Sequence, residues 1–192
     1  MSVPGDDDQI HLTNQAGDDV VVSRAYYRDN VLLPAIRITT DPAKLAAQLM
    51  NGFQDGFGGD LVAEAYRLTT IDPIPERSCC AYAQALIQAK DLARASAVLD
   101  SYDQSQPPSP FVHSLRATIA GAQDDYATAL RWQVAVMELS PNHPGSFRRL
   151  AACVNELGGG DLLWQYVEWA AGIGNTEAQA AVAQRPPQSS NS

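Results

Sequence analysis

The sequence contains only two lysines, Lys44 and Lys90, against eleven arginines. This imbalance, together with abundant alanine, is typical of a GC-rich genome and indicates a bacterial source. The three cysteines, Cys79, Cys80 and Cys153, are an odd number and cannot form a complete disulfide framework, so we expect buried, reduced thiols. No CxxC pair is present and the histidines do not stand at ligand spacing. We therefore predict no metal and no bound cofactor.

Long hydrophobic runs and an excess of positive charge are also missing. No stretch approaches the ~18 uninterrupted apolar residues of a membrane span, and the opening MSVPGDDDQIHLTNQ has neither the basic nor the apolar region of a signal peptide. The formal net charge is −9. Because such a surface repels phosphate backbones and anionic lipids, we expect no nucleic-acid and no membrane partner. We expect a cytoplasmic protein whose partner is a protein or a peptide.

A recognisable catalytic pattern is absent as well. His11, His113 and His143 are scattered, and no Ser, His and Asp set places a nucleophile on a tight turn. The glycine runs at 56–60 and 158–161 carry no lysine of a phosphate-binding loop, and they fall where turns between helices are expected. We therefore predict that the chain is not an enzyme.

What the sequence does contain is an internal repeat of 34 residues. Pro73, Pro107 and Pro141 stand 34 apart. The same step links mostly small or apolar residues in further columns, which are Leu49, Ala83, Ala117 and Ala151; Leu45, Cys79, His113 and Phe147; Leu61, Ala95, Ala129 and Leu163; and Leu68, Tyr102, Val136 and Ala170. Several registers at one period favour a repeat architecture over chance.

Each repeat unit is expected to hold two helices joined by a short turn. Prolines recur near the starts of the first helices, where a missing N–H is tolerated, and Asp41 and Ser109 precede two of them as N-caps. The predicted helices cover residues 43–54, 60–70, 76–89, 92–104, 110–122, 125–138, 144–157 and 161–172. Because one helical hairpin cannot bury its apolar face alone, the units must stack, and small residues such as alanine let the helices approach closely.

The two middle units, 76–109 and 110–143, resemble the tetratricopeptide repeat family. The unit SLRATIAGAQDDYATALRWQVAVMELSPNHP places Tyr126 and Ala129 at the turn and second-helix start of that family. The segment KDLARASAVLDSYDQSQPP is similar at Leu92, Ala95, Leu99 and Pro107. The resemblance covers about residues 42–175 in roughly four units. It implies an all-α fold, a right-handed superhelical array of antiparallel helix pairs with a concave groove for a peptide.

In this family one face of each first helix lines the groove. Projecting that face by helical spacing gives a mixed polar and apolar wall. Its amides are expected to bond a peptide backbone, and Arg77 and Arg148 to hold a carboxylate bidentately. The candidate residues are Met50, Phe53, Gln54, Arg77, Gln84, Ile87, Gln88, Phe111, Ser114, Thr118, Arg148, Asn155 and Glu156.

The segments outside the repeats are expected to differ in structure. Residues 1–17 form an acidic terminus that we expect to be disordered. Residues 18–41 are expected to be either a capping segment, with a helix from Asp18 and Asp19 to about Leu33, or an arm for dimerisation or groove occupancy. The Val20–Val22 run and residues 36–40 are equally compatible with an extended conformation. Residues 176–184 are predicted to close the array as a helix, and 185–192 to be a disordered tail.

Three hypotheses on function follow. The first is a non-enzymatic binding scaffold or chaperone-like adaptor that uses the concave face. The second is a structural subunit that forms a homo-oligomer by self-association through the array ends or the N-terminal segment. The third is a regulatory subunit of an enzyme.

Overall fold

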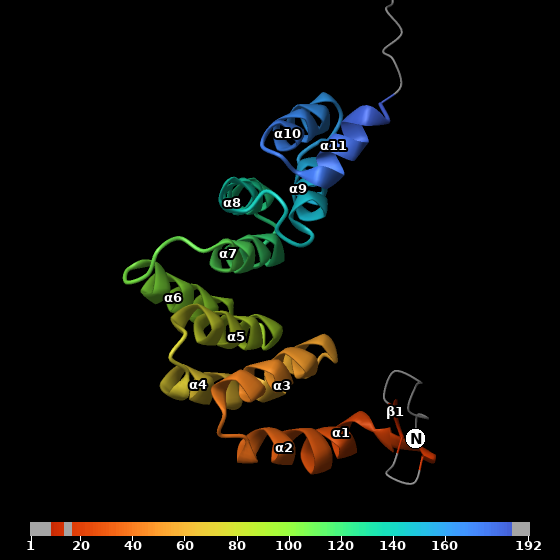
Figure 1. Ribbon diagram of the computed structural model, residues 1–192, viewed down its shortest axis with the longest axis vertical. Coiled ribbons are helices and arrows are strands. Elements are labelled where there is room, and N and C mark those ends of the chain that lie inside the picture. The colour runs from red at the N-terminus through yellow and green to blue at the C-terminus, as the bar shows by residue number, and fades with distance from the viewer. Residues whose placement is uncertain (1–8, 14–16, 186–192) are drawn as a thin grey trace, which may run out of the picture. The chain divides into compact units, whose positions relative to one another are not determined.

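The computed structural model describes residues 9–13 and 17–185 (Figure 1). It is mostly helical, as the predicted all-α class requires. The acidic run of residues 6–8 and the tail from 186 on lie outside the described residues. The chain divides into two compact units, residues 1–91 and 92–192. The 34-residue period runs past residue 91 without a change, so the sequence pattern did not mark this division.

The first unit contains a β-hairpin, which corrects the predicted disorder of residues 1–17 at residues 9–13; residues 1–8 and 14–16 lie outside the described residues. Strand β1 (Gln9–Thr13) pairs antiparallel with β2 (Asp19–Ser23), and Ile10 lies opposite Val22. The β-branched residues of β2 favour the extended conformation. The hairpin therefore realises the strand alternative for Val20–Val22 rather than the helix that we expected from residue 18.

One continuous helical segment follows the hairpin and runs through Pro34. It consists of α1 (Arg24–Tyr27), the π-helical turn η2 (Arg28–Leu32) and α2 (Leu33–Ile38), and the Ser23 hydroxyl caps its start by accepting from the Tyr26 N–H. We expected the helix to end at about Leu33, because the next residue, Pro34, lacks an N–H and its ring crowds the carbonyl four residues earlier. The wider turn just before it, with the Leu33 N–H donating to the Arg28 carbonyl, accommodates the ring instead.

The rest of the first unit is made of α3 (Pro42–Gln54), the 3₁₀ turn η3 (Gly58–Leu61), α4 (Val62–Ile71) and α5 (Pro75–Gln88). Helix α3 contacts both α4 and α5, and α4 contacts α5. Leucines at helical spacing form the core between them. The fully buried ones are Leu45, Leu49, Leu61, Leu68 and Leu86.

The second unit holds α6 (Leu92–Asp103), α7 (Pro110–Ala122), α8 (Tyr126–Leu139), α9 (Ser146–Glu156), α10 (Asp161–Gly172) and α11 (Thr176–Ala183). Figure 1 shows these helices in green to blue, and each contacts the next in the chain. Its core cluster comes from the last four helices and contains Leu130, Met137, Leu150, Val154, Ala170 and Ala178. All predicted helix ends from residue 43 on agree with the observed ends within two residues.

The 34-residue period is visible in the backbone itself, at the turn that ends each first helix. Four residues spaced by 34 have positive φ: Gly56, Lys90, Asp124 and Gly158. After each of them, the next N–H donates to a carbonyl five residues back, at 2.8–3.0 Å, which is the Schellman pattern. The accepting residues are also 34 apart and buried; they are Gly52, Leu86, Ala120 and Val154. Helices α3, α5, α7 and α9 therefore end in the same way.

Replacing Lys90 with glycine should stabilise the protein. Lys90 has φ +62, where a side chain costs ~1–2 kcal/mol that glycine does not incur. Part of this gain is lost to the larger backbone entropy of glycine in the unfolded chain. We expect a net increase of about 1 kcal/mol in the free energy of unfolding, measured by urea denaturation. The matched control is Ala89→Gly in the same turn, where φ is −73, and it should destabilise.

Enlarging an alanine of the repeat column should overpack a helix crossing. Ala129 on α8 is 1% exposed, so Ala129→Leu should lower the free energy of unfolding by about 1–3 kcal/mol. Ala127 lies on the same helix and is exposed, and Ala127→Leu should leave the stability nearly unchanged. Equal melting temperatures for the two variants would contradict the assignment of Ala129 to the crossing.

Candidate functional site

The predicted groove residues lie on the first helices, α3 and α5 in the first unit and α7 and α9 in the second. They differ widely in exposure. The exposed ones are Met50, Gln54, Phe111, Thr118, Arg148, Asn155 and Glu156; the half-buried ones are Arg77, Gln84, Ile87, Gln88 and Ser114; and Phe53 is buried. The face thus keeps most of the predicted residues accessible, but the structure gives three of them other partners.

Phe53 belongs to the core of the first unit, and its prediction as a groove residue is wrong. Its side chain is only 5% exposed. Phe53 stands four residues after Leu49 and eight after Leu45, which places all three on the buried stripe of α3. The sequence held this signal, because the apolar spacing of α3 includes Phe53.

The Gln88 amide is engaged within the first unit rather than available to a peptide. Its Nε2 donates to the Phe53 carbonyl at 3.1 Å, and its Oε1 accepts from the Gly58 N–H at 2.8 Å. A Cβ on residue 58 would stand 2.1 Å from that oxygen, so glycine is required there. Gln88 therefore clamps the turn between α3 and α4, which corrects its predicted role.

Arg77 holds a carboxylate bidentately, as predicted, but the carboxylate belongs to the chain itself. Its Nε and Nη2 each donate to Asp72 at 2.7 Å, and the Asp72 side chain is fully buried. The hydrogen bond from Arg77 lowers the pKa of Asp72, so the pair stays charged. Because a buried aspartate would lose its only guanidinium partner, Arg77 is not free to grip a ligand.

In the second unit, Phe111 is exposed in the first turn of α7. The Ser109 hydroxyl caps α7 by accepting from the N–H groups of Phe111 and Val112. The Phe111 side chain is 52% exposed, and its ring meets the His143 ring edge-on with 4.8 Å between centroids. His143 belongs to the turn before α9, so this contact ties the α7 face to the start of α9.

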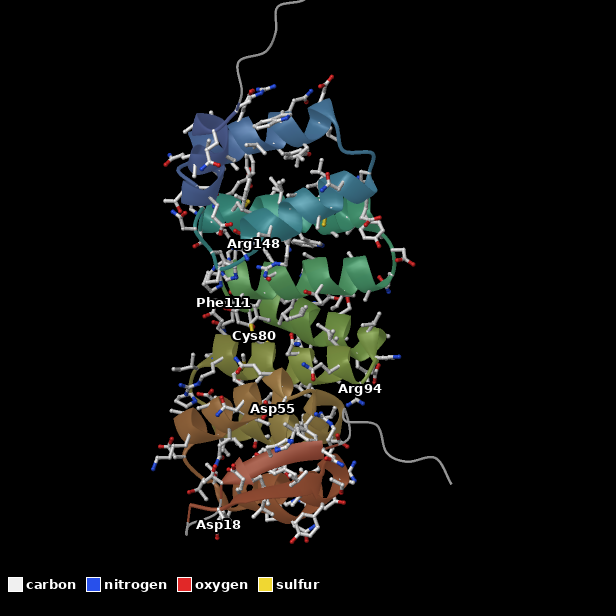
Figure 2. The ribbon with its side chains drawn as sticks, turned by 90° about the vertical axis from the view of Figure 1, so that its right-hand side faces the viewer. Asp18, Asp55, Cys80, Arg94, Phe111 and Arg148 are labelled. Carbon is white, nitrogen blue, oxygen red and sulfur yellow. The ribbon has the colours of Figure 1, made fainter. Side chains whose placement is uncertain are left out.

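Arg148 on α9 presents its guanidinium to solvent. The side chain is 83% exposed and its Nε lies 3.3 Å from Glu177 Oε2. A solvent-exposed ion pair contributes little to the stability of the fold, so Arg148 can readily exchange Glu177 for another partner. Figure 2 labels Arg148 and Phe111 on the side of the second unit that faces the viewer. Ser114 stands 34 residues before Arg148, and its carbonyl accepts from the Thr118 hydroxyl. Asn155 and Glu156 are exposed at the far end of α9.

Sequence reasoning missed a polar cluster inside the second unit. Arg116 on α7 donates from Nη2 to Asp100 at 2.8 Å and to Asp103 at 2.6 Å, both on α6. Its guanidinium carbon also lies 5.1 Å from the centre of the Trp132 ring on α8, and His113 meets the same ring at 4.9 Å. These residues come from three helices, and no sequence spacing links them.

A small cleft of about 140 Å³ opens beside this cluster. Its charged groups already have structural roles: Arg116 is held by the two carboxylates, and Asp125 caps α8 by accepting from the Thr128 N–H. The remaining lining consists of Ser96, Ile119, Ala120, Gln123 and Trp132. The cleft is therefore a feature of helix packing and not the candidate site.

Metal ligands, membrane spans and thiols can be assessed over the described residues. Among them, no three His, Cys, Asp or Glu side chains are grouped so as to hold a metal ion, and within 9–13 and 17–185 no helix is long and apolar enough to span a membrane. The cysteines form no disulfide, and burial raises the pKa of the Cys80 and Cys153 thiols, which keeps them protonated.

No model of a protein family matches the chain, and no curated protein matches it. The tetratricopeptide resemblance therefore stays a prediction.

The half-buried His113 and the buried His143 should make the protein less stable in mild acid. Burial lowers the pKa of His113, whose Nδ1 has no hydrogen-bond partner, and also that of His143. The unfolded chain therefore binds protons first, near pH 6.5, and stability is full above this pH and lost as pH falls toward the lowered pKa values.

Urea denaturation at about pH 7.5 and about pH 5.5 tests this. The wild type should lose stability between the two, and His113→Gln should lose less. His11→Gln, on an exposed strand position, is the control and should follow the wild type. If His113→Gln loses as much stability as the wild type, the loss in acid is not due to His113.

Proposed function

We propose that the protein is a non-enzymatic binding scaffold of the tetratricopeptide type, which holds a peptide segment of another protein on the faces of its first helices. In this proposal the helix pairs stack into a right-handed superhelical array, and the protein works in the cytoplasm as an adaptor or chaperone. The observation that carries it is the exposed pair Phe111 and Arg148 on two successive first helices.

The repeated helix ends support this proposal. The four Schellman turns in one 34-residue register are what a repeat array needs, because each unit must present its first helix in an equivalent way. Within the first unit Met50 and Gln84 share this register, and within the second unit Ser114 and Arg148 do so. Equivalent positions on successive helices suit an extended ligand that crosses them.

The residue types at the second-unit face support a protein or peptide ligand. Aromatic residues and arginine contribute most to binding energy at interfaces, and they do so where an apolar contact lies beside a charged one. Phe111 offers the apolar contact and Arg148 the charge, and neither is needed for the core, since Phe111 is half-exposed and Arg148 mostly exposed. By contrast, Arg77 and Gln88 are committed to partners in their own chain.

Self-association is the second candidate, and the β-hairpin favours it. The sheet has only the two strands β1 and β2, so among the described residues each strand has one edge without a partner. Val20 and Val21 of β2 are 39% and 48% exposed. An exposed edge with apolar side chains is a template for pairing with a second chain.

Peptide selection tests the scaffold function. Peptides selected on the immobilised full chain from a random library should bind it in solution, measured by fluorescence anisotropy. Phe111→Ala and Arg148→Glu should each weaken binding about tenfold, which corresponds to about 1.4 kcal/mol. The matched controls are Leu139→Ala and Arg131→Glu on α8, where both residues are exposed, and they should bind like the wild type.

Two results would decide against the scaffold. One is equal binding by all four variants, since the face would then not be the contact. The other is an absence of selected peptides together with a concentration-dependent oligomer in size-exclusion chromatography. Loss of that oligomer when Val21 is replaced by lysine would establish the edge strand as the contact.

A further inference from the structure

The start of α9 carries two arginines. Arg148 lies 3.3 Å from Glu177, and Arg149 pairs with no carboxylate of the described residues. Residues 139–155 contain no aspartate or glutamate, although the whole chain has a net charge of −9. This is the reverse of the overall charge balance. A cationic patch on an acidic protein attracts an anion while the rest of the surface repels it.

Helix α9 also begins without a side-chain cap. Its N-cap is Gly145, with φ +69, and no side chain accepts from its first-turn N–H groups. Helices α4, α5 and α10 likewise lack a side-chain cap, whereas α3, α7, α8 and α11 are capped by Asp41, Ser109, Asp125 and Asn175. The open N–H groups at a helix start bear a partial positive charge and bind anions. The first turn of α9 contains no acidic residue that would supply one.

The Arg149 guanidinium adds a full charge at this helix start. Its Nη2 donates to the Pro144 carbonyl at 2.9 Å, and a Cβ on Gly145 would stand 3.0 Å from its Nη1. The side chain is thus folded back over the first turn. Its Nε is buried without a hydrogen-bond partner, and no carboxylate of the described residues pairs with it. Burial without a counter-charge lowers the pKa of Arg149, a cost that an anion would remove.

A second polar group at the same place has no partner. Ser146 is the first residue of α9 and is fully buried, and its hydroxyl makes no hydrogen bond. A buried hydroxyl without a partner is destabilising. Because Ser146 is 0% exposed, a ligand oxygen gives this hydroxyl an acceptor only by displacing the atoms that cover the helix start, in the same first turn as Arg149.

The turn that carries these groups is pinned by the turn before α11. The Asn175 Nδ2 donates to the Pro141 carbonyl at 2.7 Å, and Asn142 Oδ1 accepts from the Thr176 N–H at 2.9 Å. The Asn142 amide also donates to the Gly174 carbonyl. A turn held on this side is preorganised, so a ligand does not need to order it.

We propose that this surface, named the α9 entry site and made of Phe111, His143, Ser146, Arg148 and Arg149, binds a carboxylate of an acidic peptide whose neighbouring side chain is apolar. The site rests on the proposed scaffold function and specifies its ligand. The carboxylate meets Arg149 and the helix start, and Arg148 can exchange Glu177 for the ligand.

The apolar half of the ligand is argued from Phe111. Its ring is half-exposed and packs edge-on against His143, so it lies next to the turn that carries the charge. A free phosphate group would use the arginines but leave the ring uncovered. An acidic residue beside a leucine or a phenylalanine uses both, which is why the proposal commits to a peptide.

Fluorescein-labelled peptides test the site on the full chain. The probes are 12-residue Gly/Ser peptides in which a Glu-Phe or Phe-Glu pair occupies successive positions, each matched by a peptide with Gln in place of Glu. The best acidic peptides should bind about tenfold more tightly than their Gln partners, and this preference should fall as salt is added. It should disappear in Arg148→Gln and Arg149→Gln but persist in Arg131→Gln.

A variant that places its own carboxylate at the helix start tests the site without removing an arginine. Asp tolerates the left-handed conformation, and the contact it would make is with the flexible end of Arg149. Gly145→Asp should therefore place a carboxylate at the helix start, weaken the acidic peptides about tenfold and raise the melting temperature. Gly145→Asn, which has the same shape without the charge, should do neither.

The outcomes separate the site from the scaffold function. Selected peptides that depend on Phe111 but show no preference for Glu over Gln would overturn the α9 entry site and leave the scaffold proposal standing. Inorganic phosphate that displaces the acidic peptides at equal concentration would show a general anion site, which also overturns the peptide assignment. If no peptide binds at all, both proposals fail.

Discussion

One backbone hydrogen bond ends all four first helices, α3, α5, α7 and α9, and recurs every 34 residues. A residue with positive φ turns the chain, and the next N–H returns to a carbonyl inside the helix, whose residue is buried. This turn has the same hydrogen bond at Gly56, Lys90, Asp124 and Gly158, but the backbone that follows differs: a 3₁₀ turn follows Gly56, and two more glycines with positive φ follow Gly158. The polar groups of the helix end are satisfied by the backbone alone, which leaves side chains of the turn free to vary.

Much of the helical framework was predictable because its signals are local. The 34-residue spacing, proline at helix starts and caps such as Ser109 depend on residues close in sequence, and the helix ends followed within two residues. The N-terminal part was less predictable. Whether Asp19–Ser23 forms a strand depends on its pairing with Gln9–Thr13, and Pro34 remains inside a helix only because a π-helical turn precedes it.

The candidate site was harder to predict than the fold, since exposure on a helix face does not say which side chains are already engaged. The Gln88 amide and the Arg77 guanidinium are groups that often bind ligands. In this chain they are already hydrogen-bonded, Gln88 to Gly58 and Arg77 to Asp72. Phe53 was misplaced because one helical face was projected too widely across α3. Arg149 escaped prediction for the opposite reason: what singles it out is a missing partner, and only the surrounding structure reveals that no carboxylate comes near it.

The contact between Gln88 and Gly58 has an evolutionary consequence. The amide oxygen occupies the space that any side chain at position 58 would need, so the two positions cannot change independently. Natural variants that gain a side chain at 58 are expected to carry a shorter residue at 88, and those that keep the glutamine are expected to keep the glycine. Linked substitution of this pair, thirty residues apart, would be a signature of the fold in any relative of this chain.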